Sequence, residues 1–255
     1  MTHLLDIRNV SRRFGGVLAV NDVTGHVDEG ELVGLIGPNG AGKTTLFNLI
    51  SGFTPLSSGT VSFDGRTISG LKTNQVARLG ISRTFQNLRV FPNMSVFDNV
   101  SVGAVGALPQ GAFGALFGSL AGGGARSAEI SRRTWEALEA VGLTHVAGEL
   151  AANLPYGQRK YLEIARALAM QPRFLILDEP AAGLNDTETR ALADFIKRLH
   201  GTGLTIMLVE HDMTLVMSIC QRILVLASGR KIADGPPDTI RRDQAVLEAY
   251  LGVDA

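Results

Sequence analysis

Short apolar runs that end in polar or glycine-rich residues divide this chain into regular elements. Three of them, at 31–36, 174–177 and 205–209, are dominated by apolar residues. Continuous runs of this length are typical of strands buried on both faces of a parallel sheet. Apolar residues at helical spacing occur at 46–50 and 187–200. The pattern therefore predicts alternating strands and helices, which is the arrangement of an α/β fold.

The first ninety residues also carry signals for antiparallel strands. The expected strands are 4–10, 17–20, 23–27, 60–63, 66–68 and 81–86. Asp64-Gly65 lies between two of them and is a strong hairpin signal, because type I′ turns favour this dipeptide. Residues 12–16 are predicted to form a loop, and 74–79 a short helix.

Two amphipathic helices are predicted in the middle of the chain, and a hairpin and a helix at its end. The first helix begins near Ser127, ends at Gly142 and has an apolar face of Ile130, Trp135, Leu138 and Val141. The second follows Gly157, and its charged face is interpreted as solvated. That face consists of Arg159, Lys160, Glu163 and Arg166. The hairpin pairs 223–226 with 231–233, and a single terminal helix is expected at 237–251.

Composition narrows the class of protein. A length of 255 residues favours one domain with a smaller subdomain over two equal domains. Lys plus Arg and Asp plus Glu are both 24, so net charge gives no argument for nucleic acid as a partner. The single cysteine, Cys220, excludes an internal disulfide. Asp6 and Arg8 interrupt the start before an apolar core forms, so no signal peptide is expected.

The stretch 99–125 has no charged residue and resembles a membrane span only at first sight. A spanning helix needs about 20 predominantly apolar residues. Here glycines supply much of the length, together with Pro109 and Gln110. We therefore expect a flexible or partly helical surface insert that contacts a membrane protein without crossing the bilayer.

The clearest candidate for chemistry lies between the predicted strand 31–36 and the predicted helix 46–50. It fits the phosphate-binding pattern G-x-x-x-x-G-K-[ST] at every required position. Its residues are Gly37, Pro38, Asn39, Gly40, Ala41, Gly42, Lys43, Thr44 and Thr45. The glycines allow several backbone N–H groups to face one polyphosphate, supported by the positive end of the helix. Lys43 can reach the β- and γ-phosphates, and the Thr44 hydroxyl can bind Mg²⁺.

Two other predicted strands end in polar residues that could act on the same ligand. Asp178 follows the run 174–177 and suits a Mg²⁺ site, while Glu179 could orient or deprotonate a water molecule. His211 follows the run 205–209 and could contact the γ-phosphate. Either signal alone is weak, because a strand-end acid or histidine is often structural. Ligands of open α/β sheets bind at the carboxyl ends of strands, so we expect the three sites to converge.

With the loop 37–45, the run 174–179 and His211 in this order, the chain resembles the nucleotide-binding subunits of ABC transporters. The resemblance covers nearly the whole length and also rests on Gln86 and on Leu154, Pro155, Tyr156, Gly157 and Gln158. It implies a P-loop NTPase core with a mainly parallel sheet, an antiparallel β-subdomain and a helical subdomain near 92–171, all within one domain, 1–255. It implies that Gln86 senses Mg²⁺ and water, that 154–158 closes over the ATP of a second subunit, and that Phe14 stacks on adenine. From the pattern alone, Phe14 could equally be a core residue.

Two departures from the family pattern matter. Pro155 and Tyr156 replace the serine and first glycine of the usual signature Leu-Ser-Gly-Gly-Gln. The Gly157 N–H is therefore expected to carry more of the clamp on the partner's γ-phosphate. Asn185 stands where the family usually has aspartate, so it can form hydrogen bonds but carries no charge, although Asp186 is adjacent.

Finer features resemble the LivG-type ATPases of branched-chain amino acid importers. They are 83–86, 156–158, 181–185 and the ending Ala249-Tyr250-Leu251-Gly252. This resemblance implies an ATP-hydrolysing subunit that works as a homodimer or paralogous heterodimer with two permease subunits. It also implies a periplasmic substrate-binding protein and a peripheral position at the cytoplasmic face of the inner membrane. Importers of urea or amides and a lipopolysaccharide exporter share several of these features, and a soluble ABC ATPase acting on ribosomes or DNA is a further alternative.

Overall fold

The computed structural model describes residues 3–85, 88–108 and 123–251. Two compact units are present in the chain. The first unit combines 1–83 with 174–255, and the second is the continuous segment 84–173. The predicted helical subdomain, near 92–171, falls within the second unit. Each unit has its own buried core.

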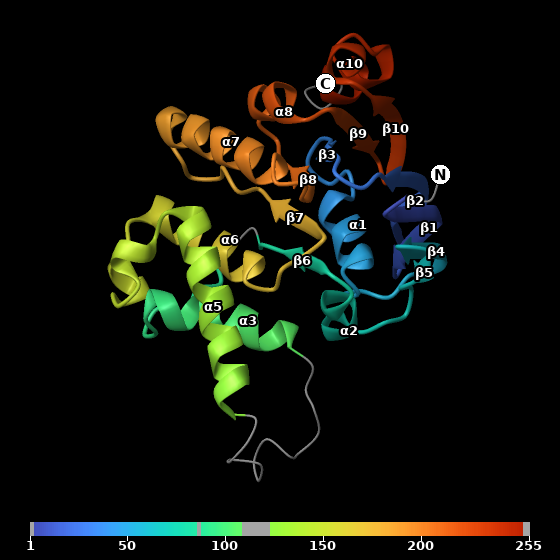
Figure 1. Ribbon diagram of the computed structural model, residues 1–255. Coiled ribbons are helices and arrows are strands. Elements are labelled where there is room, and N and C mark those ends of the chain that lie inside the picture. The colour runs from blue at the N-terminus through green and yellow to red at the C-terminus, as the bar shows by residue number, and fades with distance from the viewer. Residues whose placement is uncertain (1–2, 86–87, 109–122, 252–255) are drawn as a thin grey trace. The chain divides into compact units, whose positions relative to one another are not determined.

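A six-stranded, mainly parallel sheet forms the centre of the first unit (Figure 1). Its strands, in spatial order, are β10 (Arg230–Gly235), β9 (Arg222–Ala227), β3 (Leu32–Ile36), β8 (Thr205–Val209), β7 (Phe174–Asp178) and β6 (Ile81–Arg83). Only the β9–β10 hairpin is antiparallel. Every residue of β3, β7 and β8 is buried, which confirms the expectation from their continuous apolar runs.

A second, antiparallel sheet has the spatial order β2-β1-β4-β5. Its strands are β1 (Leu5–Phe14), β2 (Val17–Val27), β4 (Ser58–Phe63) and β5 (Arg66–Thr67). Two expectations were wrong here. The predicted loop 12–16 is mostly strand, with the turn confined to Gly15 and Gly16, and the two strands predicted at 17–20 and 23–27 are one. Polar Asp22 suggested a break, but it adopts a left-handed conformation (φ 55°) while the strand continues through it.

Helix α1 (Lys43–Ile50) shares one buried cluster with both sheets of the first unit. Alternate residues of β3 and β7 belong to this cluster, and because side chains alternate across a strand, they form one face of the parallel sheet. The cluster contains Leu46, Phe47 and Ile50 from α1, Val33 and Leu35 from β3, and Phe174 and Ile176 from β7. The helix that follows the phosphate-binding pattern is therefore fixed in position by the apolar core.

The remaining helices of the first unit are short, apart from one. They are α2 (Thr73–Arg78), α7 (Asp186–His200), α8 (Met213–Ile219), α9 (Pro237–Ile240) and α10 (Gln244–Leu251). The single terminal helix expected at 237–251 was wrong, because 241–243 separates α9 from α10. The Asp243 carboxylate accepts a hydrogen bond from the Val246 N–H at 3.2 Å, so it begins a new helix.

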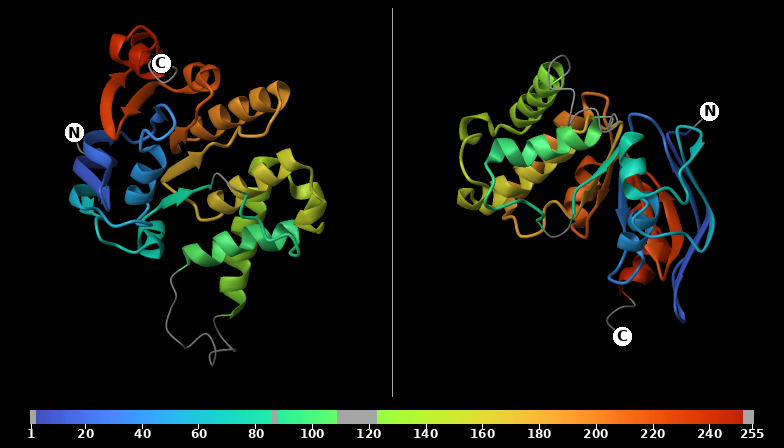
Figure 2. Two further views of the ribbon diagram at one scale, coloured as in Figure 1. Left: turned by 180° about the vertical axis from the view of Figure 1, so that it is seen from behind. Right: turned by 90° about the horizontal axis from the view of Figure 1, so that it is seen from below.

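The second unit is helical, and its three main helices pack against one another (Figure 2). They are α3 (Val96–Ala107), α5 (Gly123–Val141) and α6 (Tyr156–Leu168), with short 3₁₀ turns at Thr144–Val146 and Ala151–Asn153. Asn99 is fully buried on α3, where its amide accepts from the Phe91 N–H at 2.8 Å and donates to the Phe91 carbonyl at 2.9 Å. Asn99 thus ties the segment 91–95 to the start of α3.

Several predictions for this unit need correction. Trp135 was expected on the apolar face of α5, but 45% of its surface is exposed, while Thr134 and Leu138 are buried. The charged face of α6 was expected to be solvated, yet Lys160 and Glu163 are each 3% exposed. The uncharged stretch 99–125 is helical up to Ala107 and again from Gly123, and 109–122 lies outside the described residues. Within the described residues, no helix is long and apolar enough to cross a membrane.

Candidate functional site

The order of strands in the parallel sheet brings the predicted strand-end residues to one edge of the first unit. β8 lies between β3 and β7, and the pairs Leu35–Val209 and Asp178–Val209 are in register. The loop 37–42 follows β3, Asp178 ends β7, and His211 follows β8. Their convergence at the carboxyl edge of the sheet was predicted from the sequence, and the strand order confirms it.

The loop 37–42 depends on glycine at two positions. Gly37 has φ 151°, and a Cβ there would lie 2.1 Å from the Leu226 carbonyl oxygen. Gly42 caps α1 with φ 98°, and a Cβ there would lie 2.4 Å from the Ala19 carbonyl oxygen. Neither position accommodates a side chain. The neighbouring strands therefore force this loop into a tight curve that ends in the first turn of α1, where the backbone N–H groups have no acceptor within the helix.

Lys43 is the first residue of α1, and its side chain folds back over the loop. Its ammonium group donates to the carbonyl oxygens of Gly37 at 2.6 Å and Pro38 at 3.2 Å. Burial lowers the pKa of Lys43, and the nearby carboxylates of Glu179 and Asp178 act in the opposite direction. The lysine is thus a buried cation that contacts the loop 37–42 and is influenced by the two strand-end acids.

Asp178 is buried at the end of β7, and Arg83 at the end of β6 lies beside it. One Arg83 nitrogen is 3.1 Å from an Asp178 carboxylate oxygen, and another donates to the Asn48 side chain at 2.7 Å. Burial raises the pKa of Asp178, and the charge of Arg83 opposes that rise. Arg83 therefore connects α1 to Asp178 and supplies a compensating charge.

Glu179 has a left-handed backbone conformation, φ 48°, which is uncommon for a residue with a side chain. Its N–H donates to the Val209 carbonyl at 2.9 Å, which holds the turn in place after β7. Strained backbone of this kind concentrates at functional sites. The turn directs the Glu179 carboxylate to within 3.9 Å of the His211 Nδ1.

Glu210 is a buried acid between β8 and His211 for which the sequence pattern gave no role. Its carboxylate accepts from the Ala181 N–H at 2.8 Å and from the His211 N–H at 3.3 Å. Burial raises the pKa of Glu210. The His211 side chain is 63% exposed, and its Nδ1 lies 3.9 Å from carboxylate oxygens of both Glu179 and Glu210. Glu210 thus ties the loop after Glu179 to the segment carrying His211.

Phe14 and Gln86 are the two other residues predicted for the first site. Phe14 ends β1 and is 46% exposed, with the Arg12 guanidinium 4.5 Å from its ring centre. Its exposure fits the stacking hypothesis better than the core alternative. Gln86 lies outside the described residues.

The predicted signature residues belong to the second unit, where they begin α6. Leu154 is buried, and its carbonyl accepts from the Arg159 side chain at 2.9 Å. Pro155 is the residue before the helix, and Tyr156, 43% exposed, is its first residue. Gly157 and Gln158 follow in the first turn, where backbone N–H groups point out of the helix end. This helix start can bind an anion without a serine hydroxyl.

Asn185, which replaces the usual aspartate, caps α7. Its side-chain oxygen accepts from the N–H groups of Thr187 and Glu188, each at 3.0 Å. Glu188 completes a capping box by accepting from the Asn185 N–H at 2.9 Å. Asn and Asp are about equally good at this position, so the loss of charge leaves the start of α7 intact.

Sequence reasoning gave no site role to Arg83 and Glu210. Arg83 is 95 residues from Asp178 along the chain, so no local pattern could pair them. Glu210 did give a local signal: an acid directly after a fully buried strand, beside a candidate histidine.

Comparison with known proteins gives two matches to family models and several full-length relatives. The model described as ABC transporter matches residues 20–182. The model described as branched-chain amino acid ATP-binding cassette transporter matches 230–255. The high-affinity branched-chain amino acid transport ATP-binding protein LivG of Salmonella typhimurium is 46% identical over 253 residues, covering 98% of each chain. BraF of Pseudomonas aeruginosa, which has the same description, is 44% identical over 252 residues, again with 98% of each chain covered.

The lipopolysaccharide export system ATP-binding protein LptB of Escherichia coli is less similar. It is 34% identical over 251 residues, covering 98% of each chain. Among solved structures, the ADP conformation of an ATP-binding cassette of an ABC transporter aligns with a TM-score of 0.84 at 28% identity, covering 99% of this chain and 100% of the other. A dimeric post-hydrolysis cassette bound to ADP and Pi aligns with a TM-score of 0.75 at 25% identity, covering 91% and 98%.

Proposed function

Because this chain belongs to the ABC transporter ATP-binding family, we propose that it hydrolyses MgATP to drive import of branched-chain or other hydrophobic amino acids. ATP hydrolysis is supported by the convergence of the 37–42 loop, Asp178–Glu179 and His211 at one edge of the sheet. The amino-acid part is supported by relatives at 44–46% identity over the full length and by the match at 230–255.

In the proposed reaction, ATP binds with its phosphates on the loop that spans Gly37 to Thr45. The backbone N–H groups at the start of α1 orient these phosphates. The Lys43 ammonium group gives up its hydrogen bonds to the loop carbonyls and donates to β- and γ-phosphate oxygens instead. Glu179 accepts a proton from the attacking water, which its place at the strand edge allows. His211 donates to the γ-phosphate, and Glu210 holds the backbone of this histidine. Phe14 stacks on the adenine.

The residues present suit Mg²⁺ as a cofactor. Mg²⁺ prefers oxygen ligands and is usually held by one or two carboxylates plus phosphates. The Thr44 hydroxyl and the Asp178 carboxylate supply such oxygens at the same edge, and Gln86 is the third predicted ligand. When bound, the ion neutralises charge on the transferring phosphoryl group. Arg83 contributes by holding Asp178 from the side of α1.

The site is proposed to be completed by a second subunit, either another copy or a paralogue. The first unit supplies the phosphate loop, the acids and the histidine, but the start of α6 belongs to the second unit. In the proposed dimer, Leu154 to Gln158 of one subunit close over the nucleotide held by the other. The Gly157 N–H then contacts the γ-phosphate, because Pro155 has no N–H to donate.

Coupling to transport is proposed to run through Gln86 and the segment 90–100. The exposed aromatic Phe91 lies in this segment, tied to α3 by Asn99. A permease helix that docks here places the ATPase at the cytoplasmic face of the inner membrane as a peripheral subunit. Two permease subunits and, indirectly, a periplasmic binding protein complete the proposed importer.

Two other functions remain as alternatives. The similarity to LptB, 34% identical, supports lipopolysaccharide export as the second candidate. Urea or amide import shares the same chemistry and differs only in the permease. No nucleic acid partner is proposed, because the formal net charge is zero.

The proposed function is tested by uptake into vesicles that contain this chain, both candidate permeases and ATP. We expect ATP-dependent accumulation of labelled leucine through the binding protein, and no accumulation with the Glu179→Gln variant. Uptake of urea instead of leucine would assign the chain to the related importers. ATPase activity without any transported amino acid would contradict amino-acid import but leave the chemistry intact.

The docking proposal predicts a separation of chemistry from coupling. Phe91→Ser removes exposed apolar surface from 90–100, whereas Val96, Asn99 and Val100 are buried and unsuitable for this test. We expect basal ATPase close to wild type and amino-acid uptake reduced by about tenfold or more, as for an interface anchor. Val105→Ser, at a residue 44% exposed in the same unit but outside 90–100, is the matched control. Full uptake by Phe91→Ser would place the docking surface elsewhere, and loss of basal ATPase in a folded variant would assign the segment to the catalytic site.

A further inference from the structure

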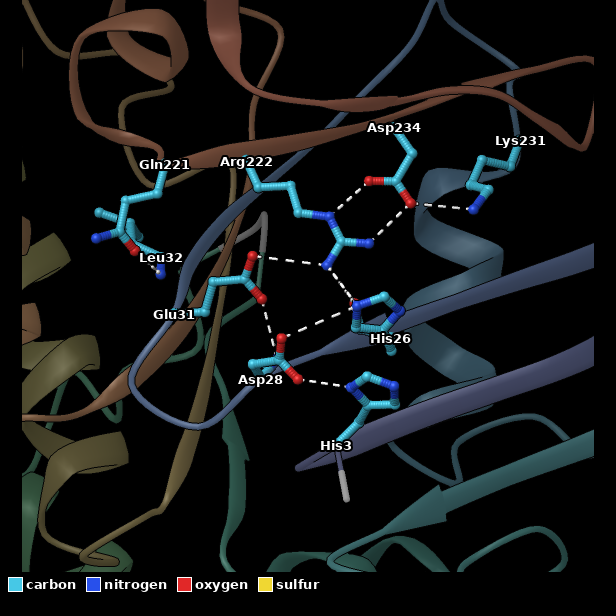
Figure 3. A network of polar contacts seen from close by, with 9 residues as sticks. All are labelled: His3, His26, Asp28, Glu31, Leu32, Gln221, Arg222, Lys231 and Asp234. Atoms are coloured by element: carbon cyan, nitrogen blue, oxygen red, sulfur yellow. Dashed lines mark hydrogen bonds and ion pairs between the residues drawn. The ribbon is translucent and has the colours of Figure 1, made fainter. Parts of the chain in front are cut away.

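A cluster of two histidines and one aspartate lies at the edge of the antiparallel sheet (Figure 3). His3 precedes β1, His26 is near the end of β2, and Asp28 follows β2. One ligand atom from each lies within 4.8 Å of the others. The pairing of Asp6 with His26 brings the start of β1 beside the end of β2, so this juxtaposition is built into the sheet register.

We propose that His3, His26 and Asp28 form a binding site for a divalent transition-metal ion, with Zn²⁺ the best match. Two imidazole nitrogens and one carboxylate oxygen are ligands that Zn²⁺ accepts in tetrahedral geometry, with water in the fourth position. Mg²⁺ is a poor match, since it requires oxygen ligands in an octahedral arrangement. The ion is therefore different from the one proposed at the nucleotide.

The three side chains must turn to bind the ion, because the two rings are stacked and His26 faces Arg222. His3 Nδ1 is 2.6 Å from Asp28 Oδ1, and His26 Nε2 is 3.9 Å from Asp28 Oδ2. Ligands about 2.0–2.1 Å from a tetrahedral ion lie about 3.3–3.4 Å from one another. These two distances are made to different oxygens of Asp28, so one of its oxygens must reach this spacing from both nitrogens. The side chains are 34%, 34% and 54% exposed, so rotation about their χ angles is open to all three.

Arg222 is the group that an incoming cation must accommodate. One Arg222 nitrogen lies 2.9 Å from the His26 Nε2, the atom offered to the metal (Figure 3). Its other nitrogens donate to Asp234 at 2.6 and 2.9 Å, so this bidentate pair holds the guanidinium when His26 turns away. Glu31, with an oxygen 3.6 Å from Arg222, adds a further negative charge.

The charges around the cluster balance, so the Asp28 ligand supplies the charge that attracts a cation. Glu31 and Asp234 are acidic, and Arg222 and Lys231 are basic. The Glu31 carboxylate also accepts from the Asp28 N–H at 2.9 Å, which fixes the backbone of the one carboxylate ligand. Outer contacts of this kind orient metal ligands.

A bound ion would tie the residue before β1 to the turn between β2 and β3. The rings of His3 and His26 are already stacked, with centroids 3.8 Å apart, so the ion would replace a weak contact by coordination bonds. The expected consequence is stabilisation of the first unit, because metal binds the folded arrangement and not the unfolded chain. No change in ATP hydrolysis is required by this role.

The test is Zn²⁺ titration of the untagged, chelator-treated full chain without nucleotide, followed by calorimetry. We expect one Zn²⁺ per wild-type chain, and affinity at least about tenfold lower in His3→Ala and in His26→Ala. Saturating Zn²⁺ should raise the wild-type melting temperature by about 5 °C and leave that of folded His26→Ala unchanged. Asp28→Asn, which keeps the size of the side chain, should weaken binding similarly.

Two controls separate this site from other histidines. His145→Ala removes an exposed histidine of the second unit, and His211→Ala removes the one beside Glu179 and Glu210. Both should bind one Zn²⁺ as wild type does. The proposal is overturned if wild type binds no Zn²⁺, if the variant lacking His3, His26 and Asp28 side chains binds it equally well, or if His211→Ala abolishes binding.

Discussion

Two helix starts in this chain are suited to phosphate, and they are built differently. At the start of α1, glycine is enforced by backbone contacts at Gly37 and Gly42, and Lys43 is buried over the loop. At the start of α6, Pro155 and Tyr156 are exposed, and neither carries a positive charge as Lys43 does. The α1 start is embedded in a core that reaches both sheets, whereas the residues that begin α6 face outward.

This difference indicates what each unit contributes. The first unit holds a cation, two acids and a histidine at one edge, which are the groups proposed to bind and polarise the triphosphate. Besides Gln86, which is a predicted Mg²⁺ ligand, the second unit contributes the backbone N–H groups at the start of α6. We infer that nucleotide binding depends on one chain, and hydrolysis on two.

The strongest way to break this comparison is Lys43→Ala. Removal of the buried ammonium takes away the point charge facing the β- and γ-phosphates. We expect weaker ATP binding and turnover lower by about 10²–10³-fold or more, measured by nucleotide titration and phosphate release. Lys197→Ala, at an exposed position of α7, is the control. Unchanged affinity together with unchanged turnover would mean that the loop does not hold the phosphates.

A second variant affects the other helix start. Gly157→Asp places a carboxylate at the position proposed for the γ-phosphate of the nucleotide held by the other subunit. The α6 helix itself should remain stable, because an acid in the first turn interacts favourably with the helix dipole. We expect ATP binding by the separate chain to stay at the wild-type level and turnover to fall by about 10–100-fold. The neutral change Gly157→Ser serves as the control. If Gly157→Asp hydrolyses ATP as fast as wild type does, α6 is not part of the active site.

The elements that could be predicted from sequence are those with a local signal. The apolar strands β3, β7 and β8 and the loop between β3 and α1 were found because apolar runs and glycines act over a few residues. Their convergence followed from one rule about the carboxyl ends of parallel strands. For the same reason the Asp64-Gly65 hairpin was found, with both residues at positive φ.

Features that depend on distant contacts were missed. The pairing of Arg83 with Asp178 joins two strands that are neighbours only in the folded sheet. Glu163 was interpreted as solvated because periodicity alone places charged residues outside. In the structure its carboxylate accepts from the Phe85 N–H at 3.3 Å and lies 3.6 Å from Arg166. These partners offset part of the cost of burying the carboxylate, and the helical pattern could not anticipate them.

The smallest predicted effect is a change with pH in the stability of the second unit, caused by Glu163. Burial raises the pKa of Glu163, and Arg166 and the Phe85 N–H oppose the rise. The folded state therefore keeps this proton more tightly than the unfolded state does, and its contribution to stability is lost as pH rises above the ordinary value. Relative to Glu163→Gln, wild type should lose stability with rising pH by at most about 1.4 kcal/mol per pH unit. Hydrogen exchange in α6 between pH 4 and 8 measures this difference, and a difference that grows in favour of wild type with pH would contradict the assignment.

The claim that one chain binds ATP and two chains hydrolyse it is tested most directly by Glu179→Gln in a sedimentation experiment with ATP. Glutamine keeps the size of the side chain but cannot accept the proton of the attacking water, so turnover should fall by about 10²–10⁴-fold. ATP should then persist between two chains, and the variant should sediment as a nucleotide-bound dimer that Gly157→Asp in the same chain disrupts. A double variant that remains dimeric, or a Glu179→Gln variant that turns over ATP near the wild-type rate, would contradict the account.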